Sequence, residues 1–82
     1  MVDILFFGKL RDIAGGGERR IALSEPARIE TIIAIIAETD DLLGSMLADP
    51  SIKCALNGVL ADRQAIVPDN AELAFLPPVS GG

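Results

Sequence analysis

The chain has 82 residues, half of them hydrophobic, and a formal net charge of −5. This length allows one small domain, and the composition is that of a globular protein and not of a disordered one. An acidic chain without a basic stripe is a poor candidate for nucleic-acid binding, and its apolar runs are too short to cross a membrane.

The first predicted element is a strand over residues 2–7, an apolar run with β-branched and aromatic side chains that ends at Gly8. Because Asp3 must face water, alternation assigns the even positions to the core and the odd positions to the opposite face. The apolar side chains expected on that opposite face are Leu5 and Phe7.

A second strand is predicted at residues 18–23, as the hairpin partner of the first. A short helical turn at residues 10–14 and three glycines at residues 15–17 connect the two strands. The glycine run lacks the Gly-Lys-Ser/Thr ending of a phosphate-binding loop and does not open a helix, so we interpret it as a turn.

The main predicted helix begins at Ile29 and ends near residues 39–40. Its apolar face is formed by isoleucines spaced three and four residues apart, namely Ile29, Ile32, Ile33 and Ile36. A shorter helix is expected to follow as far as Ala48, with Asp41 as its N-cap and Pro50 preventing its extension. Its expected core-facing residues are Leu42, Leu43, Met46 and Leu47.

The third predicted strand covers residues 52–56, with Cys54 facing the core and Lys53 and Ala55 on the opposite face. The Asn57–Gly58 pair is a strong signal for a tight hairpin turn, because both residues tolerate a positive φ.

A short return strand follows at residues 59–60, and residues 61–67 form a loop or a brief extended segment. The last strand covers residues 71–76 after a turn at residues 68–70. Glu72 must face water, which places Ala74 and Leu76 on the same face.

This order of elements predicts an α+β fold of the ubiquitin-like β-grasp type. A mixed sheet would pack on one main helix plus a short second helix, with the strongly apolar first and last strands in its interior. The β-grasp domain is expected to span residues 1–76, and residues 77–82 to form an extended C-terminal tail.

Five apolar residues share the sheet face opposite the core: Leu5, Phe7, Ala55, Ala74 and Leu76. A face that met only water would be mostly polar, and clustered exposed apolar residues mark protein interfaces. We therefore predict that this face binds a partner, unless a bulge or a loop covers it.

Chemically reactive side chains are few. The chain has no histidine, the usual general base near neutral pH, and a single cysteine. The alternation makes Cys54 a buried small hydrophobe and not a nucleophile. The acidic residues Asp40, Asp41 and Asp49 lack the spacing of a calcium loop. We expect no metal site and no catalysis by the chain alone. The lone cysteine and the absence of a leader pattern predict a cytoplasmic protein.

The C-terminal segment Pro77-Pro78-Val79-Ser80-Gly81-Gly82 is the most distinctive part of the chain. Two prolines favour an extended stalk, and a diglycine can pass where any side chain would clash. Six extended residues reach about 20 Å. The tail is therefore expected to carry a terminal carboxylate into the pocket of another protein.

Two segments resemble the small subunit of molybdopterin synthase, a family of ubiquitin-like sulfur carriers. They are the opening, residues 2–12, and the ending, residues 72–82, with its Leu-Pro-Pro-Val-Ser-Gly-Gly sequence. The match runs essentially from end to end. It departs at residues 68–70, where the family often has Asp-Gly-Asp and this chain has Pro-Asp-Asn.

The resemblance implies that the Gly82 carboxylate is adenylated by an E1-like enzyme that uses ATP and is then converted to a thiocarboxylate. The tail residues would thread into the large synthase subunit: Pro77, Pro78, Val79, Ser80 and Gly81. Sulfur delivered there becomes the dithiolene of molybdopterin in molybdenum cofactor biosynthesis. The family's usual assembly is a heterotetramer, and this chain would bind no cofactor itself.

Two kinds of alternative share the fold and the diglycine. One is a sulfur carrier for the thiamine thiazole or for tRNA thiolation. The other is a covalent modifier that forms isopeptide bonds through Gly82.

Overall fold

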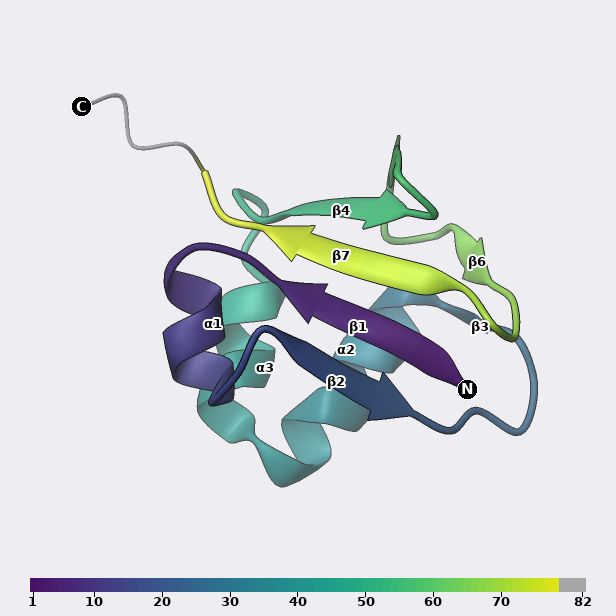
Figure 1. Cartoon of the computed structure of the whole chain (residues 1–82), viewed down its shortest axis with the longest axis horizontal. Coiled ribbons are helices and arrows are strands. Elements are labelled where there is room, and N and C mark those ends of the chain that lie inside the picture. The colour runs from purple at the N-terminus through teal and green to yellow at the C-terminus, as the bar shows by residue number, and fades with distance from the viewer. Residues whose placement is uncertain (79–82) are drawn as a thin grey trace.

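The computed structural model describes residues 1–78, which form a five-stranded mixed sheet, a two-stranded ribbon and three helices (Figure 1). The strands are β1 (Val2–Phe6), β2 (Glu18–Ile21), β3 (Ala27–Arg28), β4 (Lys53–Leu56), β5 (Val59–Ala61), β6 (Ile66–Val67) and β7 (Glu72–Leu76). The helices are α1 (Lys9–Ala14), α2 (Ile29–Thr39) and α3 (Asp41–Leu47). The predicted α+β, β-grasp class is confirmed, with a true helix, α1, where a helical turn was expected.

The large sheet has the order β2-β1-β7-β4-β5. The first and last strands, β1 and β7, run parallel to each other, and every other pair in this sheet is antiparallel. Phe6 of β1 lies opposite Phe75 of β7, and their rings stack with centroids 6.1 Å apart. These two large buried side chains thus connect the first and last strands. Burial of each stabilises the fold by roughly 1.5–3 kcal/mol, because its apolar surface leaves water.

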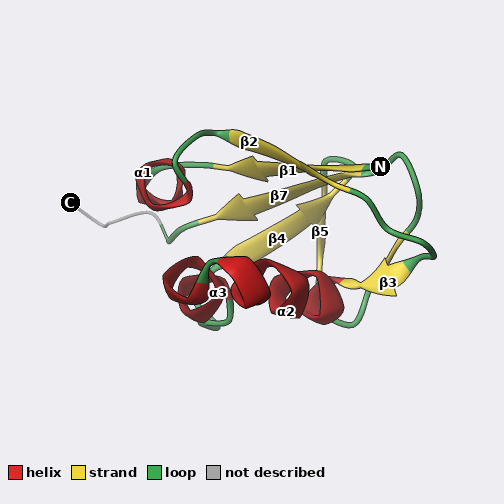
Figure 2. Ribbon diagram, turned by 90° about the horizontal axis from the view of Figure 1, so that it is seen from below, coloured by secondary structure: helices red, strands yellow, loops and turns green. Residues whose placement is uncertain are grey.

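The core lies between the sheet and the helices α2 and α3, which cover the same face (Figure 2). The even positions of β1 are fully buried, as predicted, and so are the isoleucines of α2 at the expected spacing. The fully buried large side chains are Val2, Ile4, Phe6, Leu10, Ile29, Ile32, Ile36, Leu43, Leu47, Val67, Leu73 and Phe75.

Helix α2 starts without a side-chain cap, because the guanidinium of Arg28 at its N-cap position has no acceptor atom. Instead, the N–H groups of Ile29 and Glu30 donate to the carbonyl oxygens of Ala65 and Arg63, at 3.1 and 3.0 Å. These backbone acceptors satisfy donors that every helix start leaves unpaired. The segment predicted as a loop or a brief extended stretch supplies them, and within it β6 pairs with β3.

Two expectations about α3 are wrong. Its N-cap is Asp40 and not Asp41, because the Asp40 carboxylate accepts the N–H of Leu43 at 3.2 Å. Leu42 is 64% exposed and does not face the core. The reason is a close helix crossing: α3 turns Gly44 toward α2, so that Leu43 and Leu47 are buried and Leu42 points to solvent.

Gly44→Ala should destabilise the domain. A Cβ at this position would lie 2.3 Å from the Cβ of Ala37 on α2. In an unhindered helix this change gains up to about 1 kcal/mol, whereas overpacking a helix contact costs roughly 1–3 kcal/mol. We expect the second effect to win, and urea unfolding measures it.

The control is Ser45→Ala on the exposed side of α3, which should shift the unfolding free energy by less than about 0.5 kcal/mol. Ala37→Gly combined with Gly44→Ala should recover part of the loss. A gain in stability for Gly44→Ala alone would contradict the close packing of α2 and α3.

Candidate functional site

The sheet register brings the predicted interface residues together. Ala74 of β7 lies directly between Leu5 of β1 and Ala55 of β4. Directly opposed residues point to the same face of a sheet. Phe7 follows the end of β1, and its N–H donates to the carbonyl oxygen of Phe75 at 3.3 Å, which places it beside Leu76.

These residues differ in how much they meet water. Phe7 is 44% exposed, and Leu5, Ala55 and Leu76 are half-buried. Ala74 is buried, with 8% of its surface exposed, so its expected exposure is wrong. It sits on the middle strand, and its single methyl group lies lower than the larger neighbouring side chains.

Leu60 on β5 belongs to the same face and was not identified from the sequence. It pairs with Ala55 and is 71% exposed. The signal was present, because a two-residue turn at Asn57–Gly58 forces Leu56 opposite Val59 and therefore Ala55 opposite Leu60.

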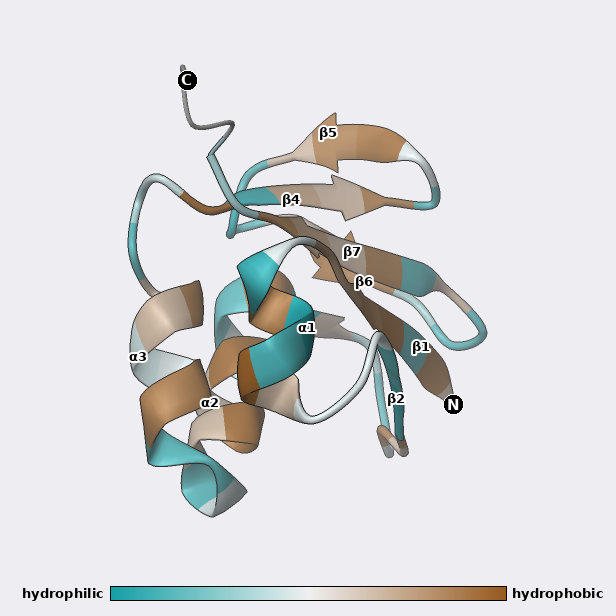
Figure 3. Cartoon of the chain, turned by 60° about the vertical axis from the view of Figure 1, so that its left-hand side comes forward, coloured by the Kyte–Doolittle hydropathy of each residue, from teal (hydrophilic) through white to brown (hydrophobic). Residues whose placement is uncertain are grey.

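We call this surface the outer apolar face. Figure 3 shows the apolar colouring that runs along β5 and over most of β7. Its members are Leu5, Phe7, Ala55, Leu60, Ala74 and Leu76.

A groove of about 530 Å³ joins the outer apolar face to the start of the tail. Phe7, Leu60 and Leu76 line it together with Pro77 and Pro78, and it is mostly apolar. The surface and the tail are thus continuous. Its size and apolar lining suit apolar side chains at the point where the chain leaves β7.

The first tail residue, Pro77, lies in close contact with the loop after β1. Gly8 has a φ of 58°, and a Cβ added there would lie 2.8 Å from Cγ of Pro77. Glycine permits both this backbone conformation and the approach of the proline ring. Pro77 is half-buried and Pro78 exposed. The other predicted tail residues, Val79, Ser80 and Gly81, and the predicted reactive residue Gly82, lie outside the described residues.

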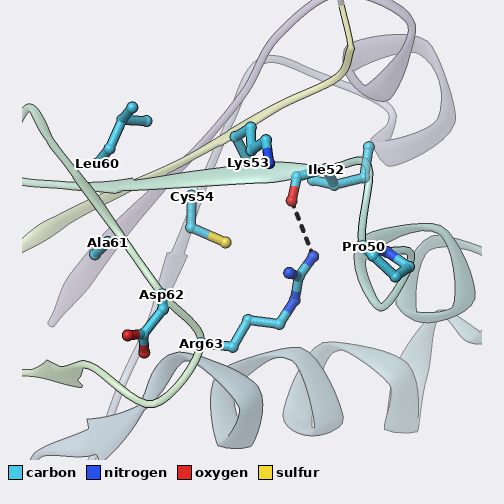
Figure 4. A pocket seen from close by; sticks show the side chains of 8 residues that line it. All are labelled: Pro50, Ile52, Lys53, Cys54, Leu60, Ala61, Asp62 and Arg63. Carbon is cyan, nitrogen blue, oxygen red and sulfur yellow. Dashed lines mark hydrogen bonds between the residues drawn. The ribbon is translucent and has the colours of Figure 1, made fainter.

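Cys54 lies on the opposite side of β4 from Lys53, beside a pocket of about 470 Å³ (Figure 4). It is 3% exposed, which confirms the prediction of a buried small hydrophobe. Burial raises the pKa of its thiol, and the nearby positive charge of Arg63 opposes this shift only in part. A neutral, buried thiol is a poor nucleophile.

Arg63 lines the same pocket and stabilises the backbone around it. Its Nη2 donates to the carbonyl oxygens of Leu47, Asp49 and Ile52 at 2.9, 2.8 and 3.0 Å. The contact to Ile52 is drawn in Figure 4. One guanidinium therefore stabilises the connection between α3 and β4. The side chains that line this pocket are not arranged as a catalytic group.

Two of the three acidic residues singled out in the sequence, Asp40 and Asp49, have structural partners. Asp40 caps α3, and the carboxylate of Asp49 accepts the N–H of Ser51 at 2.8 Å, a bond that lowers the pKa of Asp49. Between residues 1 and 78 there is no group of three or more His, Cys, Asp or Glu side chains placed to hold a metal ion. Over the same residues, every helix is too short or too polar to cross a membrane.

Comparisons of the sequence with known proteins identify a family that matches nearly the whole chain. The model of the ThiS family matches residues 4–82. The molybdopterin synthase sulfur carrier subunit of Escherichia coli is 30% identical over 82 residues, which cover all of both chains.

Two solved structures share the fold. SAMP1 from Haloferax volcanii superposes with a TM-score of 0.86 at 24% identity, covering 99% of this chain and 98% of that one. A chain in the complex of subunits 1 and 2 of the molybdopterin-converting factor from Helicobacter pylori has a TM-score of 0.67 at 26% identity, with 99% of this chain and 97% of that one covered.

Cys54 should resist alkylation while the domain is folded. At neutral pH we expect iodoacetamide to react with it at least about tenfold more slowly in buffer than in denaturant, because the thiol is buried and its pKa is raised. The native rate should rise as the pH is raised toward that pKa. Mass spectrometry of the alkylated protein measures both.

The matched control is Leu60→Cys in a Cys54→Ala background, which puts a thiol on the exposed side of the same hairpin. It should react at nearly the same rate folded and unfolded. Equal rates for native and denatured Cys54 would refute its placement in the core.

Proposed function

This chain belongs to the ThiS family, and we propose that it carries sulfur, as a thiocarboxylate on Gly82, to the large subunit of molybdopterin synthase. The observation that carries the proposal is the match with the Escherichia coli molybdopterin synthase sulfur carrier subunit, which covers every residue of both chains. An alignment of that extent includes the diglycine and the domain that presents it.

The proposed chemistry starts from a weak electrophile. A carboxylate at Gly82 is anionic and resists attack, so its oxygen must first displace pyrophosphate from ATP to give an acyl-adenylate. Sulfide then attacks the carbonyl carbon, the bond to AMP breaks and a thiocarboxylate remains. If the donor is a persulfide, the first product is an acyl disulfide, and a thiol must reduce its S–S bond to release the thiocarboxylate. The chain has no histidine to serve as a general base for these steps. An E1-like enzyme would supply that catalysis and bind the ATP.

In the delivery step the thiocarboxylate sulfur attacks a carbon of the pterin precursor in the large subunit. A carbon–oxygen bond at that carbon breaks, and the displaced oxygen leaves as water or stays on the phosphate group of the precursor. Water then cleaves the bond between sulfur and the Gly82 carbonyl, which restores the carboxylate and leaves sulfur on the product. The contribution of this chain is positional. The groove beside Pro77 and Pro78 continues the outer apolar face, so docking and insertion of the tail would occur together.

The outer apolar face gives the partner-binding proposal its physical basis. Exposed Phe7 and Leu60 lie on either side of the more buried Leu76, at the end of the sheet where the tail begins. Burying such side chains against a partner releases water from apolar surface. The Helicobacter pylori structure is a complex of two subunits, and one of its chains is 26% identical to this chain. A heterotetramer with the large subunit, in the cytoplasm, remains our proposal for the assembly.

The alternative functions also begin with activation of the Gly82 carboxylate, and they differ in what the activated group is transferred to. A carrier for the thiamine thiazole or for tRNA thiolation would also form a thiocarboxylate but would dock on a different acceptor. A covalent modifier would instead join Gly82 to a lysine of another protein. We favour molybdopterin synthase because the full-length curated relative bears that name.

Incubation with the activating enzyme, ATP and a sulfur donor should increase the intact mass of the chain by the difference between one sulfur and one oxygen atom. We expect this single increment because the terminal carboxylate is the only group in the chain that exchanges an oxygen atom for a sulfur atom. Mass spectrometry of the whole protein and of its C-terminal peptide locates the change.

The chain lacking Gly82 is the control: it should fold with an unchanged melting temperature, gain no sulfur and support no molybdopterin formation. A mass equal to a conjugate with another protein would favour the modifier function. Molybdopterin formation by the truncated chain would refute the carrier proposal.

Phe7→Asp and Leu60→Asp should each weaken binding to the large subunit by about 2 kcal/mol, or roughly 30-fold in Kd, because a charge replaces an apolar anchor. Both positions are exposed, so the unfolding free energy should change by less than about 1 kcal/mol. Isothermal titration calorimetry and urea unfolding measure the two quantities.

Val59→Asp is the matched control, since Val59 is 69% exposed on the same strand but points away from the outer apolar face. Its affinity should stay within about twofold of the original. Equal losses at Val59 and Leu60 would show that this face is not the binding surface.

A further inference from the structure

The chain contains only two lysines, Lys9 and Lys53. Lys9 is the first residue of α1 and Lys53 the first residue of β4. The starts of these two elements and the end of β7 lie at the same end of the sheet, where the tail leaves the domain (Figure 1). Two elements far apart in the sequence thus bring both lysines to one place.

Both lysines stand beside the described part of the tail. Lys53 lies opposite Leu76 in the sheet and lines the groove that contains Pro77 and Pro78. Lys9 lines a separate, smaller groove of about 100 Å³ that also contains Pro78. We call Pro77 and Pro78 the root of the tail. Positively charged side chains therefore lie on two sides of this root.

Within residues 1–78, Lys9 and Lys53 form no ion pair and donate no side-chain hydrogen bond. The lowered pKa of Asp49 comes first from the hydrogen bonds of Ser51, then from the charge of Arg63, and only last from the charge of Lys9. Two carboxylates lie near them, Asp49 in the groove of Lys9 and Asp62 in the pocket next to Lys53. Each already accepts a backbone N–H, from Ser51 at 2.8 Å and from Gln64 at 2.7 Å. In a chain of net charge −5, these two cations remain available to a partner.

We propose that Lys9 and Lys53 form an electrostatic guide that aligns the tail with a partner whose tail-receiving opening carries carboxylates. The inference rests on the proposed function, and it names that partner as the large synthase subunit. The hydrophobic effect at the outer apolar face is not directional, so it does not orient the two proteins before they touch. Positive charges on both sides of the tail root attract carboxylates at longer range and favour one orientation of the domain relative to the partner.

A protein carboxylate fits the site better than a nucleotide phosphate. A phosphate bound at Gly82 would be four residues beyond Pro78, about 13 Å when the tail is extended. That distance exceeds the reach of a lysine side chain rooted beside Pro78. The rim of the opening, in contrast, meets the tail root as the domain docks.

The test measures association rates of the full-length chain with the large subunit by stopped flow, at several salt concentrations. Lys9→Glu and Lys53→Glu each change the net charge by −2, and we expect each to slow association about fivefold or more at low salt. The difference should nearly vanish near 1 M salt, where the Debye length is about 3 Å. Lys53→Gln should fall between the original chain and Lys53→Glu.

Arg28→Glu is the matched control, with the same change in net charge on the short strand β3 at the other end of the molecule (Figure 2). If it slows association as much as the lysine variants do, the effect is one of net charge and the guide is refuted. Unchanged rates for Lys9→Glu and Lys53→Glu refute it as well. Failure of the original chain to bind the large subunit at all would instead overturn the proposed function, and the guide with it.

Discussion

The parallel pairing of β1 with β7 is the contact on which the rest of this structure depends. It joins the first and last strands through four residue pairs and the stacked rings of Phe6 and Phe75. It is extended at the other end by the N–H of Asp3, which donates to the carbonyl oxygen of Ala71. Because β7 is held in the middle of the sheet, the tail must leave the domain beside the loop that follows β1.

This arrangement gives the two faces of the sheet different tasks. One face buries the even positions of β1 against α2 and α3 and provides the stability. The other face carries apolar residues that the described part of the chain leaves half-buried or exposed, and these end at the groove beside Pro77. A small domain gains nothing in solubility from such a surface. Its continuity with the tail is explained if docking and delivery are one event, which is what the proposed carrier function requires.

Local sequence rules predicted the elements that depend on neighbouring residues. Alternation around Asp3 and Glu72 identified the core-facing positions of β1 and β7, and the isoleucine spacing identified the inner face of α2. The Asn57–Gly58 turn followed from the two residues alone, and both adopt a positive φ. The tail could be recognised in the same way, because Pro-Pro and Gly-Gly restrict or free the backbone wherever they occur.

The sequence by itself thus determined the strands of the large sheet, the main helix, the buried cysteine and the chemical nature of the tail, since each follows from side-chain periodicity or backbone preference. Only the tertiary structure decided which surfaces meet. It set the rotation of α3 through the contact of Gly44 with Ala37, the capping of α2 by the carbonyls of residues 63 and 65, and the burial of Ala74. It also placed Lys9 and Lys53 beside Pro77 and Pro78. These features depend on how separate elements pack against one another, which the pattern within one element does not encode.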